Sequence, residues 1–437
     1  LVADWHAGLF SFASVEGRPT IAFEAGIGDD RGIEYALGRE LVPPSDRFER
    51  TNLDGPPRNL LTTQMAMESI NGRPAVTYSL YPGEVAYVQA EDEEGNSWPG
   101  PEPVVDAPGR WVSLASVEEP LVIGQTVRSR SAFPRFEPVV PIVAYFDYTE
   151  GIGFARASDL SASSWDSPLV LDSSDDSSDE YRHLSLGIVD DRPGLAYIRL
   201  DHILGIRYRP SLRYVAATDD RGEGWGEPVF VNRVGDEWEH SSPDSLAVSL
   251  AEVDGRPAVA FFELDGQDLH YVRAQDSAGT GWPSPQPVWT KGDVGRYLSL
   301  KVVNGNPAVA FYDAGEGDLL YSRAEDATGD SWAAAVVVDS DPDVGRYASL
   351  EVIDGRPAIA YYNATDRNLR YVTAADSNGE TWGQPLVVDS PGDLGEYPDL
   401  ERIDGRAAIA YYDRTDRSLR YAILEPASTA ARHWTLY

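Results

Sequence analysis

The sequence predicts an all-β protein, a single eight-bladed β-propeller with four antiparallel strands in each blade. Three observations predict it: a similar hydrophobic segment recurs about every 50 residues, tight turns separate short strands, and no window has sustained helical periodicity. Repeats of four short strands are typical of propeller blades, which close into a ring and so protect their edge strands. An open stack of sheets is the alternative architecture.

The repeat is clearest near the C-terminus, where Gly305, Gly355 and Gly405 lie 50 residues apart. Each glycine belongs to an Asn-Gly or Asp-Gly pair, which favours a tight turn between two strands. Around the middle copy we expect strands at residues 348–353, 358–362, 369–374 and 386–389. Related turns elsewhere, with one degenerate copy at residues 141–147, give eight predicted blades at residues 5–41, 59–105, 111–172, 181–232, 244–290, 297–339, 347–389 and 397–437.

Closure of the ring requires an outer strand for the last blade. Residues 1–4 (Leu-Val-Ala-Asp) resemble residues 386–389 (Leu-Val-Val-Asp), the outer strand expected in another repeat. We therefore predict one domain over residues 1–437, in which the N-terminal strand completes the last blade. Residues 433–437 are the alternative source of that strand.

The composition excludes several classes of protein. The chain of 437 residues has a net charge of −35 and no cysteine, so disulfides, thiolate metal sites and cysteine nucleophiles are excluded. Such an acidic surface repels nucleic acid and anionic membranes, and no apolar stretch is long enough for a membrane helix. Two lysines against 34 arginines suit a high-salt habitat or a GC-rich genome. The start, without Met or signal sequence, suggests a trimmed form of a longer protein.

A second motif, Asp-x-x-Gly-x-x-Trp, recurs between the third and fourth strands of the repeats. It includes Asp376, Gly379 and Trp382, and its tryptophans are Trp98, Trp165, Trp225, Trp282, Trp332 and Trp382. The motif resembles the Asp-box of sialidase-like propellers, although the family's Asp lies two places before Gly and here it lies three. The resemblance implies a blade hairpin, in which Asp accepts backbone hydrogen bonds, Gly adopts a turn conformation and Trp packs against its own blade and the next.

The candidate binding face carries the connections between blades and between the second and third strands, because these vary most in length. Just before the innermost strands come arginines, which suit a carboxylate or sulfate, and aromatic residues, which suit sugar rings. The predicted ligand-binding residues are Arg110, Trp111, Arg182, His183, Arg296, Tyr297, Arg346, Tyr347 and Tyr397. The alternative is that each arginine pairs with a neighbouring acid.

The resemblance also raises sialidase chemistry, which needs three arginines, a Tyr–Glu pair and an acid. The chain has no Arg-Ile-Pro motif near its start, and sialidase rings have six blades. Glycoside hydrolysis by two carboxylates stays an alternative. Asp339, Asp341 and Asp343 alternate along a loop and predict a calcium site, with a solvated acidic loop as the alternative. No other cofactor is expected.

The function predicted from the sequence is a non-catalytic propeller, secreted or at the cell surface, that binds a carbohydrate or a protein partner. A glycan-active hydrolase or lyase with its site at the channel mouth is the first alternative. A purely structural subunit of a surface assembly is the second.

Overall fold

The computed structural model describes residues 10–15, 18–25, 32–37, 48–53, 60–80, 84–105, 109–119, 138–173, 180–204, 207–236, 238–239 and 246–424. Where one domain was expected, the chain divides into two compact units, Leu1–Phe48 and Glu49–Tyr437. The described residues form strands and turns, and they include no helix that is long and apolar enough to cross a membrane.

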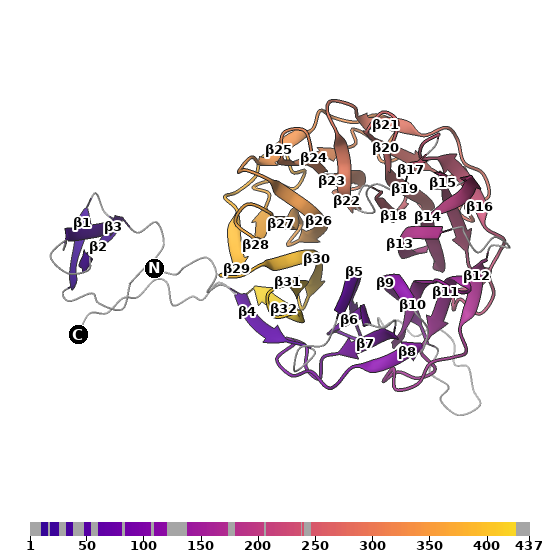
Figure 1. Ribbon diagram of the computed structural model, residues 1–437, viewed down its shortest axis with the longest axis horizontal. Helices are drawn as coiled ribbons and strands as arrows, with labels where there is room; N and C mark the ends of the chain where they lie inside the picture. Colours follow the sequence, from indigo (N-terminus) through magenta and orange to yellow (C-terminus); the bar gives the residue numbers. More distant parts are fainter. Residues whose placement is uncertain are drawn as a thin grey trace, which may run out of the picture. The chain divides into compact units, whose positions relative to one another are not determined.

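The second unit contains a β-propeller of seven blades arranged around a central channel (Figure 1). Each blade is an antiparallel sheet whose first strand lies next to the channel and whose fourth strand lies outermost, as the repeat predicted. The prediction of eight blades is wrong. The count relied on turns related to those at Gly305, Gly355 and Gly405. Such a turn specifies a hairpin, and a hairpin alone does not make a blade.

The blade strands follow one another along the chain, apart from one outer strand. Three blades comprise β5 (Leu60–Ile70), β6 (Arg73–Leu80), β7 (Glu84–Gln89), β8 (Glu102–Val105); β9 (Gly109–Glu118), β10 (Val139–Asp147), β11 (Gly151–Arg156), β12 (Leu169–Asp172); and β13 (Glu180–Val189), β14 (Arg192–Leu204), β15 (Arg207–Ala216), β16 (Val229–Arg233), with the short β17 (Trp238–Glu239) beside β15.

The other four blades have the same order. They comprise β18 (Val248–Val253), β19 (Arg256–Glu263), β20 (Asp268–Arg273), β21 (Gln286–Trp289); β22 (Val294–Val303), β23 (Asn306–Asp313), β24 (Asp318–Arg323), β25 (Val336–Asp339); β26 (Val344–Ile353), β27 (Arg356–Asn363), β28 (Asn368–Thr373), β29 (Leu386–Asp389); and β30 (Leu394–Ile403), β31 (Arg406–Asp413), β32 (Ser418–Leu424), β4 (Phe48–Asn52).

The predicted first blade, residues 5–41, forms a separate sheet in the first unit. This sheet contains β1 (Phe10–Val15), β2 (Arg18–Ala25) and β3 (Gly32–Leu37), paired antiparallel, and no fourth strand joins it among the described residues. Residues 38–50 lack the Asp-x-x-Gly-x-x-Trp motif that links a third strand to a fourth in most repeats. The three described strands therefore match the first three strands of a repeat, and the sequence that follows them lacks the motif of the outer hairpin.

A strand from the N-terminal side closes the ring, although its residues differ from those predicted. β4 lies at the outer edge of the last blade, beside β32. The Leu53 amide donates to the Leu419 carbonyl oxygen over 3.0 Å, and the Arg50 guanidinium lies 3.3 Å from the Asp389 carboxylate of the preceding blade. Residues 1–4 and 433–437, predicted for this edge, lie outside the described residues.

The Trp motif links neighbouring blades. The Trp382 indole donates to the Gly379 carbonyl oxygen over 2.9 Å and packs on Tyr321 of the preceding blade, with ring centroids 5.2 Å apart. A Cβ atom at Gly379 would lie 2.5 Å from that ring, so a side chain does not fit there. Partial burial disfavours the Asp376 carboxylate, but hydrogen bonds from Thr381 and the backbone lower its pKa to about 2. Equivalent ring pairs are Trp98–Tyr421, Trp165–Tyr87, Trp225–Phe154, Trp282–Tyr214 and Trp332–Tyr271.

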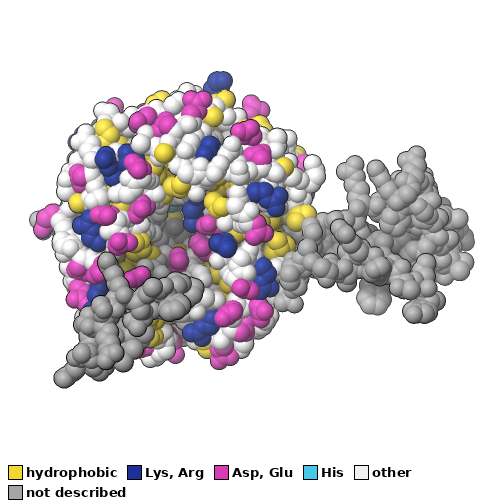
Figure 2. Space-filling view, turned by 180° about the vertical axis from the view of Figure 1, so that it is seen from behind, with side chains coloured by type: hydrophobic (Ala, Val, Ile, Leu, Met, Phe, Trp, Pro, Cys, Tyr) yellow, Lys and Arg dark blue, Asp and Glu magenta, His cyan; other side chains and the backbone are white. Residues whose placement is uncertain are grey.

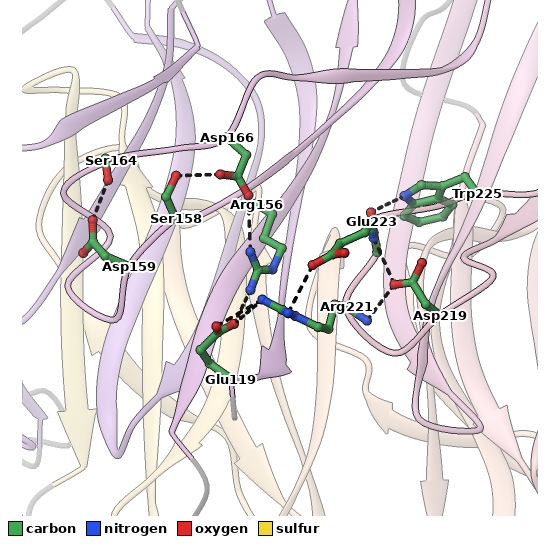
Figure 3. Close-up of polar contacts among 11 residues, drawn as sticks. Glu119, Arg156, Ser158, Asp159, Ser164, Asp166, Asp219, Arg221, Glu223 and Trp225 are labelled. Carbon is green, nitrogen blue, oxygen red and sulfur yellow. Dashed lines mark hydrogen bonds and ion pairs between the residues drawn. The ribbon is translucent and has the colours of Figure 1, made fainter. Parts of the chain in front are cut away.

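Ion pairs add to this packing between two of the blades (Figure 3). Glu119, at the end of β9, pairs with Arg156 of its own blade and lies 3.0 Å from Arg221 of the next blade. Arg156 also lies 3.2 Å from Asp166. Acidic and basic side chains are intermixed across the broad face seen in Figure 2. These pairs let a strongly acidic chain neutralise charge locally between its blades.

Candidate binding site in the central channel

The central channel contains a cavity of about 270 Å³ that all seven blades line. Its walls are the innermost strands β5, β9, β13, β18, β22, β26 and β30, together with residues just before β18. A ligand in this cavity would therefore contact every blade of the ring. The size suits a small molecule or one end of a longer one, because typical ligand pockets begin at about 300 Å³.

Five ring side chains form what we call the aromatic collar: Trp111, His183, Tyr297, Tyr347 and Tyr397. Each lies near the start of an innermost strand, where the pairing register shifts by a bulge. All five have positive φ, between 39° and 56°, a conformation that is uncommon for residues other than glycine. The bulge turns these side chains into the channel, which ordinary strand alternation would not achieve.

The collar rings lie against one another. Tyr347 has ring centroids 4.4 Å from Tyr297 and 4.2 Å from Tyr397, and Trp111 lies 4.2 Å from His183. Burial, together with the neighbouring Tyr397 and Tyr297, raises the pKa of Tyr347 far above its ordinary value. The Tyr347 hydroxyl therefore stays neutral, and the three tyrosines place their rings at the cavity.

Below the collar, a ring of hydrogen bonds joins the innermost strands. In five blades a serine hydroxyl accepts the backbone amide of the next blade over 3.0–3.1 Å: Ser113, Ser185, Ser249, Ser299 and Ser349. Asp399 takes this position in β30 and accepts the Met67 amide over 2.7 Å. Ala66 has the equivalent position in β5, judged by its pairing with Thr77, and it has no hydroxyl.

Five charged residues in the channel, Glu68, Lys301, Glu351, Asp399 and Glu401, form what we call the channel charge cluster. Lys301 Nζ lies 2.7 Å from a Glu351 oxygen and 3.7 Å from a Glu401 oxygen. The four residues other than Asp399 share one register position on consecutive strands, since each pairs with the alanine at the third residue of its second strand. The other three blades have Ala115, Gly187 and Ala251 near this level, so they add no charge.

Burial controls the protonation of this cluster. Burial, the largest effect, raises the pKa of Glu68 to about 7, although Lys301 lowers it. Burial likewise raises the pKa of Glu401 well above its usual range. For Lys301 burial disfavours the ammonium, but Glu401 and Glu351 outweigh it and raise the pKa. The lysine therefore stays charged, while Glu68 exchanges its proton near neutral pH.

The structure separates the predicted arginines from the predicted aromatic residues. Arg296 forms two hydrogen bonds to Asp293, of 2.9 and 2.7 Å, and Arg346 binds Asp343 in the same way. Arg182 lies 2.6 Å from Glu180, and Arg110 lies over the Tyr148 ring. The five collar residues come together at the cavity, whereas Arg182, Arg296 and Arg346 have acidic partners. Of the variable connections predicted to form this face, residues 42–47, 54–58, 174–179 and 240–243 lie outside the described residues.

Sequence reasoning missed the channel charge cluster. One signal was available: Lys301, one of two lysines in the chain, is followed at intervals of 50 residues by Glu351 and Glu401. When repeats form a ring, residues at the same position of adjacent repeats lie close together. Opposite charges at that position therefore indicate an ion pair. Glu68 and Asp399 gave no comparable signal, because their repeats differ in spacing or residue type.

The predicted calcium ligands have other partners. Asp339 accepts hydrogen bonds from the Tyr361 hydroxyl over 2.5 Å and from Arg370 over 3.1 Å. Asp341 lies 2.6 Å from Arg370, and Asp343 binds Arg346. Among the described residues no group of three His, Asp or Glu side chains is placed to hold a metal ion. Calcium binding stays a prediction, and the contacts seen for Asp339 link neighbouring blades.

Comparison with known proteins gives structural likeness alone. No family model matches the chain, and no curated protein matches it. Among solved structures, it is similar to the NanB sialidase from Streptococcus pneumoniae (12% identity, 90% of this chain and 74% of that chain, TM-score 0.45), the α-L-arabinanase from Penicillium chrysogenum (12%, 86% and 97%, 0.47) and the fucose-specific lectin from Aleuria aurantia (11%, 77% and 99%, 0.44). At 11–12% identity and with TM-scores below 0.5, this similarity concerns the fold alone and carries no argument about the activity of the chain.

Proposed function

We propose that the protein is a binding propeller that holds a small carbohydrate, or the end of a longer one, in the central channel. The observation that carries the proposal is the aromatic collar, which places the rings of Tyr297, Tyr347 and Tyr397 side by side at a cavity of about 270 Å³. Sugar rings have an apolar face and polar edges. Aromatic rings contact the face, and neutral hydroxyl groups bond the edges.

The contacts of the carboxylates favour binding over hydrolysis. A glycosidase needs two carboxyl groups free to flank the scissile bond, one as acid and one as base or nucleophile. Here one ammonium, that of Lys301, lies between Glu351 and Glu401, and Asp399 accepts bonds from Met67 and Ser349. These interactions hold three of the four carboxylates in the scaffold.

One observation supports hydrolysis as a second candidate. Burial raises the pKa of Glu68 to about 7, which suits a general acid that works near neutral pH. A glycan that is bound and then cleaved by the wild type, but bound intact by Glu68→Gln, would establish this activity in place of simple binding.

A glycan-binding measurement with matched variants tests the proposal. Tyr347→Ala is expected to weaken the binding of any recognised glycan at least about tenfold, or about 1.4 kcal/mol, while Tyr347→Phe retains the ring and most of the affinity. Phe230→Ala is the control, because Phe230 is an exposed aromatic residue on an outer strand. Equal affinity of Tyr347→Ala and the wild type, with both folded, would contradict the proposal.

A further inference from the structure

The channel charge cluster carries more negative than positive charge. With all groups ionised it has four carboxylates and one ammonium, and the ammonium lies within 4 Å of Glu351 and Glu401. Asp399 has neutral donors instead, the Met67 amide and the Ser349 hydroxyl. The cavity that the collar lines is therefore acidic at its centre.

Glu68 is the unpartnered member of the cluster. Its side chain is partly buried and lines the cavity. Among the described residues it makes no hydrogen bond and no ion pair. A buried carboxylate without a partner costs free energy unless a proton or a cation compensates it. The raised pKa of Glu68 agrees with such a cost.

Two arginines near the mouth of the same channel are already paired with acids. Arg296 and Arg346, the bases nearest Tyr297 and Tyr347, each bind an aspartate with two hydrogen bonds. An acidic sugar would have to displace these aspartates and would then approach the carboxylates of the cluster. Aromatic rings, by contrast, attract a cation that lies over their faces.

We infer that the channel selects a ligand with a protonated amine, whose ammonium group reaches Glu68 and Glu401 while the aromatic collar holds the rest of the molecule. This inference rests on the proposed function insofar as it names an amino sugar as the ligand. Both an amino sugar and a simple alkylamine supply the ammonium group. The two differ in the ring that the collar would contact.

Calorimetric titration of the wild-type protein at pH 7 with four probes tests the inference. Glucosamine is expected to bind at least about tenfold more tightly than N-acetylglucosamine or glucose, which lack the charge. Equal affinities for the three sugars would overturn the inference and leave the proposed function standing. Binding of propylamine without any sugar would support the amine site and overturn the carbohydrate proposal. Failure of both amines to bind would overturn the inference.

Two substitutions that change the charge of the cluster give a second test, because they are expected to change the affinity for glucosamine in opposite directions. Glu68→Gln is expected to lower the affinity for glucosamine at least fivefold more than the affinity for glucose, whereas Lys301→Gln is expected to raise the affinity for glucosamine. Glu380→Gln, an exposed acid in a hairpin remote from the cavity lining, is the control. A purely structural cluster would shift all sugars alike, and that result would contradict the inference. Thermal melting of each variant checks that it is folded. The comparison of the four probes uses the wild-type protein alone, so it does not depend on how the variants fold.

Discussion

At the scale of single residues, the channel keeps several groups in states that cost stability. Tyr347 and its collar neighbours have positive φ without being glycine, a conformation that costs on the order of 1 kcal/mol or more at each position. Glu68 lies in a site that disfavours its charge. Such costs persist where the surrounding fold imposes them, and they gather here at the cavity that we propose as the binding site.

Glu68 gives a pH-dependent prediction that needs no ligand. Its folded pKa of about 7 lies above the ordinary value of 4.5, so the folded state binds the proton more tightly than the unfolded state. Stability is therefore expected to fall as pH rises from about 4.5 to 7. Glu68→Gln avoids this loss and should be more stable than the wild type at pH 8, by about 1–3 kcal/mol, with little difference at pH 4. Denaturant titrations at both pH values measure it, and a constant difference would refute the buried charge.

Trp382 gives a prediction about packing between blades. Its half-buried ring lies on Tyr321 of the preceding blade and bonds the Gly379 carbonyl group. Trp382→Ala is expected to cost about 2–3 kcal/mol, somewhat below the 3–5 kcal/mol of a fully buried tryptophan. Trp382→Phe should recover part of the loss. Unchanged melting of the alanine variant would show that the ring does not stabilise the contact between blades.

At the scale of elements, the innermost strands are joined by six hydrogen bonds from a backbone amide to a side-chain oxygen of the preceding blade. The contact between β5 and β9 differs, because Ala66 stands where the other blades have serine or aspartate. The contact between β5 and β9 therefore lacks the side-chain hydrogen bond that joins each of the other pairs of innermost strands.

Ala66→Ser supplies the missing hydroxyl group. The variant is expected to gain about 1 kcal/mol of stability, the usual net value of one hydrogen bond, provided that the hydroxyl reaches the Leu114 amide. Ser349→Ala, which removes an equivalent bond to Leu400, should lose a similar or larger amount. Denaturant titration of the pair measures both changes. A loss of stability in both would show that the alanine is required at the β5 position.

At the scale of the whole molecule, β4 completes the last blade of the ring. Without it, β32 would have an unpaired edge and the last blade would have three strands. Seven complete blades need no strand from residues 1–47. The hydrophobic clusters agree with a closed ring, since one of them joins Met65 and Tyr78 to Ile403 and Tyr421 across the contact between the first and last blades.

Two truncations test the role of β4. A chain that begins at residue 48 is expected to keep the melting temperature of the propeller, because its seven sheets are intact. A chain that begins at residue 54 loses β4 and is expected to lose about 3 kcal/mol or more, which lowers the melting temperature by several degrees. Equal melting of the two truncated chains would mean that β4 does not hold the ring closed.

Much of this fold could be predicted from local patterns. The Asn-Gly and Asp-Gly turns at Gly305, Gly355 and Gly405 identified the hairpins, and the Trp motif identified the links between outer strands. The number of blades could not be derived in this way, because residues 10–37 have the hairpin pattern of a blade without joining the ring. The collar was predicted from its place before each innermost strand. The charge cluster was missed because its members meet across blades, where a single chain segment gives no sign of them.

The pairing of β4 with β32 has a consequence for folding during synthesis of the chain. β4 precedes every other strand of the propeller in the sequence, whereas its partner strand β32 follows all of them. β4 therefore stays without its partner strand while the other six blades are synthesised. The last step of folding then pairs two strands that lie far apart in the sequence. A chain released before residue 418 would have its first six blades complete but would lack β32. β4 would then have no partner strand, and its exposed edge would favour aggregation.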